Sequence, residues 1–214
     1  MTELKKSLLR LAIQNDFIAS CKDHDYQLNL VGKYDYMESP YFISQELEAA
    51  GIEVHPSCKE MLDAYITPIL LEKAKTQGIP IPSYYISNGY FEPPVIIDPI
   101  NPFMIKSRTV IAANNIEKIS RSMTRNFTYA ICCQELPHDA VIKRFRSVLG
   151  WSVNKKFREM STMIWEVFRI PLAKVRVIVL SQGEILLSDI SHLPFEDLND
   201  KELNFIMGKV QWGK

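Results

Sequence analysis

The sequence has no excess of either charge and no long hydrophobic run. Its 25 Lys and Arg residues balance 25 Asp and Glu residues. Proteins that hold duplex nucleic acid through bulk electrostatics usually carry a basic excess. The longest apolar runs fall far short of the roughly 20 residues that cross a bilayer. We therefore expect neither duplex nucleic acid nor a membrane as a partner.

Cysteine is scarce as well. The four cysteines, Cys21, Cys58, Cys132 and Cys133, show no CxxC spacing, and the adjacent pair cannot easily bridge itself. This arrangement fits neither a zinc site nor a secreted disulfide framework. Charges interrupt the apolar positions of the first residues, MTELKKSLLRLAIQNDF, which is unlike a signal peptide. These features predict a protein of the reducing cytoplasm.

What is present is the composition of a globular protein. The chain has 214 residues, of which 47% are hydrophobic and 23% charged, and this suits one compact domain or two small lobes. Helical spacing of apolar residues predicts a helix over 3–19. A strand at 27–32, a helix at 40–50 and a strand at 52–54 predict a small α/β unit with parallel pairing. We assign residues 1–56 to this front lobe.

The rest of the chain predicts a second, more antiparallel part. A capping box at Ser57 and Glu60 starts one helix, and Thr67–Pro68 starts another that ends at Gly78. Further strands are expected at 84–87, 103–106, 129–134, 146–153, 172–180 and 184–190, and further helices at 114–123, 158–168 and after Asn199. The last two strands form a hairpin through residues 181–183. The fold class is therefore α/β or α+β.

Two segments could hold an anion. Lys106 ends an apolar strand, and a lysine at a strand edge suits phosphate oxygens as a point charge; the alternative is a solvated lysine. Between Val141 and Arg158 there are six basic residues and no acidic one, which favours an anionic ligand unless this is simply a solvated face. His138 beside Asp139 is a weaker sign, since such pairs are often only surface pairs.

Two further segments carry charges on apolar strands. Asp189 lies at the end of a strand, where a carboxylate is a suitable ligand for magnesium. The alternative is that its carboxylate accepts hydrogen bonds from the backbone N–H groups of a turn. Arg176 is a charged residue within KVRVIV, and it either faces phosphate or is exposed. The exposed alternative is favoured, because Lys174 and Arg176 share one face at the strand period of two.

The order of the segments resembles the ATP-grasp superfamily. The capped helix DAYITPILLEKAKTQGIPIP, an apolar strand ending in lysine, ICCQELPHDAVIKRFRSVLG and EILLSDISHLPFEDL follow one another as in that superfamily. The His-x-Ala-Val and D-I-x-x-x-P spacings most resemble inositol 1,3,4-trisphosphate 5/6-kinases. The resemblance implies that residues 57–214 form an ATP-grasp-like region, with a nucleotide-clamping lobe at about 80–135 and a C-terminal lobe at about 136–214. Both lobes are expected to be mainly antiparallel α+β.

The resemblance also implies roles for individual residues, with ATP and Mg²⁺ as cofactors. Catalytic roles fall on Lys106 and Arg176, nucleotide contacts on Lys106, Gln134 and Glu135, contacts to a small anionic substrate on His138, Lys143, Arg144 and Arg146, and metal ligation on Asp189 and Glu184.

The chain departs from the superfamily pattern at several positions. The penultimate strand usually carries an acidic residue, and here the nearest position is Arg176. Asn usually follows the metal-binding Asp by two residues, and here Ser191 stands there. The loop at 107–115 has no glycine. The front lobe is short, so a second copy or a partner chain could complete it.

Three functions remain open at this point. The first is an ATP-dependent phosphotransferase acting on a small phosphorylated, inositol-phosphate-like substrate. The second is an ATP-dependent carboxylate–amine ligase of the same fold. The third is a degenerate ATP-grasp-like binding or assembly module without catalysis. The basic segment favours a polyanionic substrate, whereas the missing acidic residues favour the third function, because phosphoryl transfer depends on metal to neutralise charge.

Overall fold

The computed structural model describes residues 2–36, 38–101, 104 and 107–213. These residues form two compact units, each built from separate stretches of the chain. Unit 1 comprises Met1–Leu62, Phe145–Lys174 and Ser191–Lys214, and unit 2 comprises Asp63–Arg144 and Val175–Ile190. The front lobe expected at residues 1–56 and the lobes expected after it stay a prediction.

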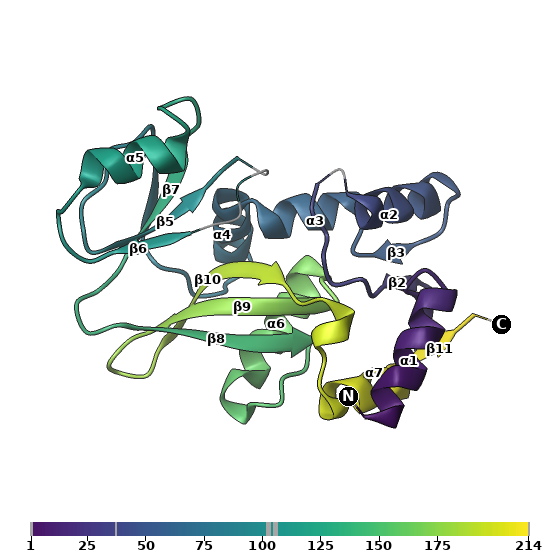
Figure 1. The fold of residues 1–214 in the computed structure, drawn as a ribbon. Coiled ribbons are helices and arrows are strands. Elements are labelled where there is room, and N and C mark those ends of the chain that lie inside the picture. The colour runs from purple at the N-terminus through teal and green to yellow at the C-terminus, as the bar shows by residue number, and fades with distance from the viewer. Residues whose placement is uncertain (1, 37, 102–103, 105–106, 214) are drawn as a thin grey trace. The chain divides into compact units, whose positions relative to one another are not determined.

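The structure is a mixed α+β fold with several sheets, as the sequence predicts (Figure 1). The helices are α1 Glu3–Gln14, α2 Ser39–Ala49, α3 Cys58–Tyr65, α4 Thr67–Thr76, α5 Ile116–Thr124, α6 Arg158–Phe168 and α7 Asp200–Lys209. The strands are β1 Ile18–Cys21, β2 Gln27–Asn29, β3 Val54–His55, β4 Tyr84–Ser87, β5 Val95–Pro99, β6 Arg108–Val110, β7 Ile131–Glu135, β8 Val141–Val148, β9 Leu172–Val179, β10 Ile185–His192 and β11 Val210–Trp212. In the part of the chain that is described, no helix is long and apolar enough to span a membrane.

Unit 1 contains a four-stranded sheet in the order β11-β1-β2-β3. The predicted parallel pairing is confirmed: β2 and β3 run parallel, with Gln27 opposite Val54. Strands β1 and β11 were not predicted, and both are short strands of three or four residues. Strands β1 and β11 pair antiparallel with each other, and β1 also pairs antiparallel with β2. One sheet of unit 1 therefore combines strands from both ends of the sequence.

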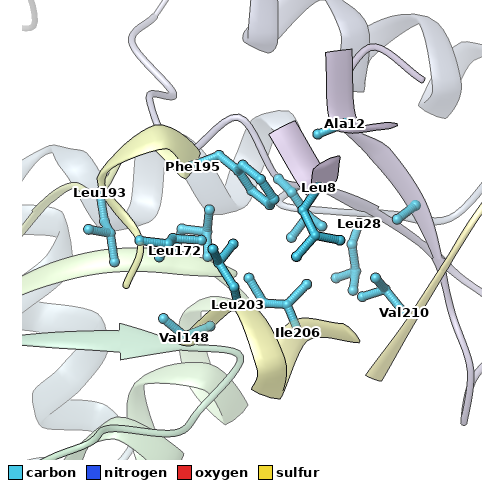
Figure 2. Packing of buried hydrophobic residues seen from close by; sticks show 13 residues of the cluster. Leu8, Ala12, Leu28, Val148, Leu172, Leu193, Phe195, Leu203, Ile206 and Val210 are labelled. Carbon is cyan, nitrogen blue, oxygen red and sulfur yellow. The ribbon is translucent and has the colours of Figure 1, made fainter. Parts of the chain in front are cut away.

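An apolar cluster of 13 buried residues lies in the interior of unit 1 (Figure 2). Leu8 and Ala12 of α1 lie four residues apart and therefore share one face of the helix. Figure 2 shows that face turned toward Leu203 and Ile206 of α7, with Leu28 of β2 beside them. The two ends of the chain thus contribute to the same core.

Unit 2 contains a second four-stranded sheet, in the order β4-β7-β5-β6, whose neighbouring strands are all antiparallel. Helix α5 covers one face of this sheet (Figure 1). Its residue Met123 packs with Val95 and Ile97 of β5 and Cys133 of β7. These strand residues alternate along the chain, so one face of the sheet is apolar and faces the helix.

The third sheet has the order β10-β9-β8. The predicted hairpin between β9 and β10 is confirmed, because the backbone N–H of Leu180 donates to the carbonyl of Glu184 at 2.9 Å and closes the turn. The divisions between unit 1 and unit 2 fall within these three strands and within α3. Residues 175–179 and 185–190 therefore belong to unit 2 together with the second sheet.

Several predicted boundaries are wrong for identifiable reasons. The helix expected over 3–19 ends at Gln14, because Asp16 and Phe17 have φ angles of 49° and 59°, outside the helical range. The strand expected at 146–153 is instead β8, which ends before Leu149 and Gly150, both with positive φ. Of the strand expected at 103–106 only Met104 is described, and it is not in a strand.

Candidate functional site

The candidate site lies within unit 2, where strands β5 and β7 of one sheet pack against β9 and β10 of another. Ile96 of β5, Leu136 just after β7, Ile178 of β9 and Leu186 of β10 form an apolar cluster between them. This cluster shows which residues of each strand point toward the other sheet.

Each of these strands carries a polar residue two positions from its apolar one. The four are Asp98, Gln134, Arg176 and Ser188, and all are buried. Because side chains alternate across a strand, residues two apart lie on the same face. The polar residues therefore form a second layer between the sheets, next to the apolar cluster. Sequence order separates them by up to 90 residues, so only the fold brings them together.

An ion pair forms the centre of this polar layer. Arg176 is 3% exposed, and its Nη2 lies 2.7 Å from Oδ2 of Asp98, which is 2% exposed. The guanidinium also donates from Nε to Oγ of Ser188 at 2.8 Å and from Nη1 to Oγ of Ser107 at 2.8 Å. A charged pair at this depth is expensive to desolvate unless hydrogen bonds satisfy its remaining groups. Here the two serines provide them.

Gln134 completes the layer from strand β7. Its Nε2 donates to Oδ2 of Asp98 at 2.6 Å and to the carbonyl of Ser188 at 2.9 Å. These two bonds fix the orientation of the amide. Its Oε1 is buried and has no hydrogen-bond partner among the described residues. A buried acceptor of this kind is unusual and is one place where a ligand could donate a hydrogen bond.

Asp189 follows Ser188 on β10 and is electrostatically linked to the same pair. Desolvation raises the pKa of Asp189 to about 7, although Arg176 and, more weakly, Arg144 act to lower it. The nearby charge of Asp98 also raises the pKa, since two carboxylates disfavour each other's ionised form.

Burial likewise raises the pKa of the Cys132 thiol above its usual range, so this cysteine is an unreactive thiol.

A separate cavity of about 540 Å³ opens on unit 2. Tyr85, Tyr90, Glu92 and Glu135 line it together with three prolines and a leucine. Glu135 and Gln134 are adjacent on the chain, so they point to opposite sides of strand β7. Glu135 therefore faces solvent at this cavity, while Gln134 is buried in the polar layer.

Comparison with solved structures identifies this arrangement of sheets. No family model and no curated protein sequence matches the chain. The D-alanine–D-alanine ligase from Helicobacter pylori superposes over 78% of this chain and 67% of its own, with 14% identity and a TM-score of 0.57. The chain has the ATP-grasp fold. This confirms the fold expected from the order of its segments.

Two other ATP-grasp structures agree with this assignment. An ATP-grasp RimK domain protein from Sphaerobacter thermophilus matches 78% of this chain and 71% of its own, at 12% identity and a TM-score of 0.56. N5-carboxyaminoimidazole ribonucleotide synthetase from Thermotoga maritima matches 86% of this chain and 59% of its own, at 12% identity and a TM-score of 0.51. The chain spans only part of the length of such proteins; it covers 60% of the ATP-grasp ligase PsnB. Similarity at this level of identity establishes the fold alone.

The ATP-grasp fold brings some of the predicted site residues together. Arg176, Gln134 and Asp189 are spatial neighbours in unit 2. Arg176 is buried, however, so the interpretation that favoured an exposed position is wrong. That interpretation assumed one solvated face, whereas nearly every residue of β9 is buried and both faces are covered. Lys106 lies outside the described residues.

The residues predicted to bind substrate divide into two groups. His138, Lys143 and Arg144 are exposed on unit 2, at and just before the start of β8. Arg146 belongs to unit 1, where its guanidinium donates to the carbonyl of Asp197 at 2.5 Å and pairs with Glu202 at 3.3 Å. Both contacts of Arg146 are with residues of unit 1.

The two predicted metal ligands do not converge. Glu184 is exposed just before β10 begins, and Asp189 lies five residues further along. At about 3.3 Å per residue their Cα atoms are roughly 16 Å apart, too far for one Mg²⁺ with its short oxygen bonds. Among the residues that the structure describes, no three His, Cys, Asp or Glu side chains are placed to hold a metal. The predicted pair of Glu184 and Asp189 therefore does not form one magnesium site.

Sequence reasoning missed Asp98, Ser107 and Ser188. A signal for Asp98 was available, because it is the one charged residue in the apolar run VIIDPI. The prolines around that run made the segment look like a series of turns and concealed strand β5. The two serines carry no such signal, since serine is common at exposed and buried positions alike.

Proposed function

We propose that the chain is a nucleotide-binding protein of the ATP-grasp ligase type, which uses ATP to join a carboxylate to an amine. Its fold is that of a D-alanine–D-alanine ligase and of a RimK domain protein, with TM-scores of 0.57 and 0.56. The inositol-phosphate kinase expected from short spacings gains no support from these structures. Ligase chemistry is therefore the better proposal.

The observation that carries the proposal is the buried polar layer of unit 2. Two sheets that served only as a core would bury apolar residues, as Ile96 and Ile178 do next to it. Instead the chain buries Asp98, Gln134 and Arg176, which is costly for stability. Buried charges of this kind are concentrated at functional sites.

The first test is nucleotide binding by the wild-type chain. We expect ATP and ADP to raise the melting temperature, because a ligand at a hundred times its Kd stabilises the folded state by about 2.7 kcal/mol. Calorimetric titration would then give the affinity, and Lys106→Ala is expected to lose binding while remaining folded. No stabilisation by ATP at millimolar concentration, with or without Mg²⁺, would reject the proposal.

The product distinguishes a ligase from a kinase. A ligase releases phosphate only when both a carboxylate and an amine are supplied, because the acyl phosphate needs an acceptor. A kinase transfers the phosphoryl group to its substrate without an amine. Measuring phosphate release with and without added amines, at fixed ATP, separates the two activities.

The exposed basic residues of unit 2 are candidates for holding an anionic substrate. Lys143 and Arg144 are adjacent and exposed on β8, with His138 close by in the sequence. Replacing both basic residues by Glu is expected to weaken substrate binding, seen as a higher KM. The matched control is the same double change at Lys155 and Lys156, which belong to unit 1 and are also exposed.

A second candidate function, nucleotide binding without catalysis, is favoured by one observation. The ion pair of Asp98 and Arg176 occupies the interior of the polar layer, and the carboxylates here do not fit a metal. Phosphoryl transfer needs positive charge to balance the charge that develops on the phosphate. Nucleotide binding without phosphate release for any carboxylate and amine supplied would support this second function.

A further inference from the structure

Arg176 holds a fixed positive charge inside unit 2. Its Nε, Nη1 and Nη2 donate to Ser188, Ser107 and Asp98 at distances of 2.7 to 2.8 Å, so all three nitrogens are held. A fourth, longer bond at 3.4 Å joins Nη2 to the carbonyl of Ser188. A guanidinium restrained on every nitrogen cannot swing away to admit another cation.

We propose that the Arg176 guanidinium takes the place of a divalent cation in this site, so that the chain binds its nucleotide without magnesium. The exclusion of the metal follows from the geometry of unit 2 alone. The statement about nucleotide rests on the function proposed above. The two parts are therefore tested separately.

The carboxylates of the site are unsuited to a divalent cation. Oδ2 of Asp98 already accepts hydrogen bonds from Arg176 and Gln134, so this oxygen has little capacity left for a metal ion. Asp189 is subject to the positive charges of Arg176 and Arg144, and Glu184 is too distant to help. A divalent ion entering here would meet the guanidinium's charge at short range in a poorly solvated space.

The guanidinium can supply part of what a cation would supply. It carries a permanent positive charge. Its Nη1, which donates one N–H to Ser107, has a second N–H that can donate to a phosphate oxygen. Because the surrounding groups already hold it in place, little entropy is lost when a ligand binds. The unpartnered Oε1 of Gln134 adds an acceptor beside it. The layer thus offers both a cationic group and a hydrogen-bond acceptor from the protein itself.

The wild-type protein tests both parts. Titration with Mn²⁺ alone, followed by electron paramagnetic resonance, is expected to show no bound ion up to millimolar concentration. Calorimetric titration with ADP is expected to give the same Kd, within twofold, in excess EDTA and in millimolar Mg²⁺. A stoichiometric Mn²⁺ site, or ADP binding at least tenfold tighter with Mg²⁺, would overturn the inference.

Failure of the proposed function has a different signature. If ADP and ATP bind in neither buffer, the nucleotide function is wrong, and the Mn²⁺ titration alone then decides whether the site excludes metal. A bound Mn²⁺ ion in that case rejects the exclusion as well. No bound Mn²⁺ supports it.

A charge reversal provides the converse test. Arg176→Asp would bring a third carboxylate to Asp98 and Asp189, and it is expected to bind Mn²⁺ at least tenfold more tightly than the wild type. The matched control is Lys174→Asp, which makes the same charge change two residues earlier on β9, in unit 1. Equal Mn²⁺ binding by the two variants would contradict the assignment to Arg176.

A second variant covers the case in which Arg176→Asp does not fold. Arg176→Gln removes the charge while keeping an amide that can donate hydrogen bonds. Its ADP affinity in EDTA is expected to fall at least tenfold. An unchanged affinity would show that Arg176 contributes no charge to the ligand and would reject its proposed role.

Discussion

At the scale of residues, the most informative feature is a buried arginine that satisfies a buried aspartate. Arg176 and Asp98 lie on different sheets, 78 positions apart in the chain, and are joined at 2.7 Å. Gln134 donates to the same carboxylate oxygen. Such a network stabilises the fold only while each member is present, because each alone would be an uncompensated buried group.

Replacing Arg176 or Asp98 alone is therefore expected to lower the free energy of unfolding more than replacing both. Arg176→Met leaves the carboxylate of Asp98 buried without its cation and should lower the free energy of unfolding by about 3–5 kcal/mol. The double variant Arg176→Met, Asp98→Leu should recover most of that loss. Urea denaturation of the two single variants and the double variant measures the coupling. Additive losses would show that the pair does not act as a unit.

Asp189 is expected to make stability depend on pH. Desolvation raises its pKa to about 7 in the folded state, from an ordinary 3.8. The folded chain therefore holds this proton more tightly than the unfolded chain does. The resulting stabilisation is complete below about pH 4 and is lost as the pH rises toward about 7.

Asp189→Asn should remove this pH dependence. The free energy of unfolding of the wild type should fall from about pH 4 to about pH 7 relative to that of the variant. Asp139→Asn is a useful control, because a hydrogen bond from Ser181 lowers the pKa of this exposed carboxyl, so its contribution has the opposite sign. Parallel pH profiles for wild type and Asp189→Asn would contradict the assignment.

At the scale of elements, helix α7 illustrates a start signal that the sequence contains in full. Asn199 accepts hydrogen bonds from the backbone N–H groups of Lys201 and Glu202 at 3.0 and 3.1 Å. The carboxylate of Glu202 accepts in return from the N–H of Asn199 at 2.9 Å. This is a complete capping box, and it begins the helix where the sequence predicts it.

Asn199→Ala should destabilise the protein by about 1 kcal/mol, because two N–H groups at the start of α7 lose their acceptor. Urea denaturation measures the change. Lys201→Ala on the first turn of the same helix is the control and is expected to stay within about 0.5 kcal/mol of wild type. An equal effect of the two substitutions would argue against a role for the cap.

At the scale of the whole molecule, each unit has apolar packing of its own. Leu203 lies in the core of unit 1, whereas Ile97 lies beneath α5 in unit 2. The chain passes between the units several times, so neither is a continuous segment. Because each unit has buried apolar contacts of its own, the two units can differ in local stability.

Leu203→Ala tests this independence. The cavity left in unit 1 should cost about 2–5 kcal/mol. In native-state hydrogen exchange, amides of α1 and α7 should lose protection, while those of β5 and β7 should change little. A uniform loss across all four elements would show instead that the two units unfold together.

The sequence by itself determined features that depend on neighbouring residues. The cap at Asn199, the turn between β9 and β10 and the helix at Ile116–Thr124 follow from local spacing and turn chemistry, and the order of segments was enough for the ATP-grasp fold. The short strands β1 and β11 escaped detection because three or four residues carry too little periodicity.

Tertiary structure alone decided the nature of the site. The sequence pattern predicts an exposed position for Arg176 on a half-buried strand. Arg176 is buried because a second sheet packs over β9. Nothing in the spacing of Asp98 and Arg176 reveals that they meet, because pairing across 78 residues depends on how two sheets are stacked. The same packing places the guanidinium of Arg176 beside Asp98, because a buried carboxylate needs a positive charge and hydrogen-bond donors next to it.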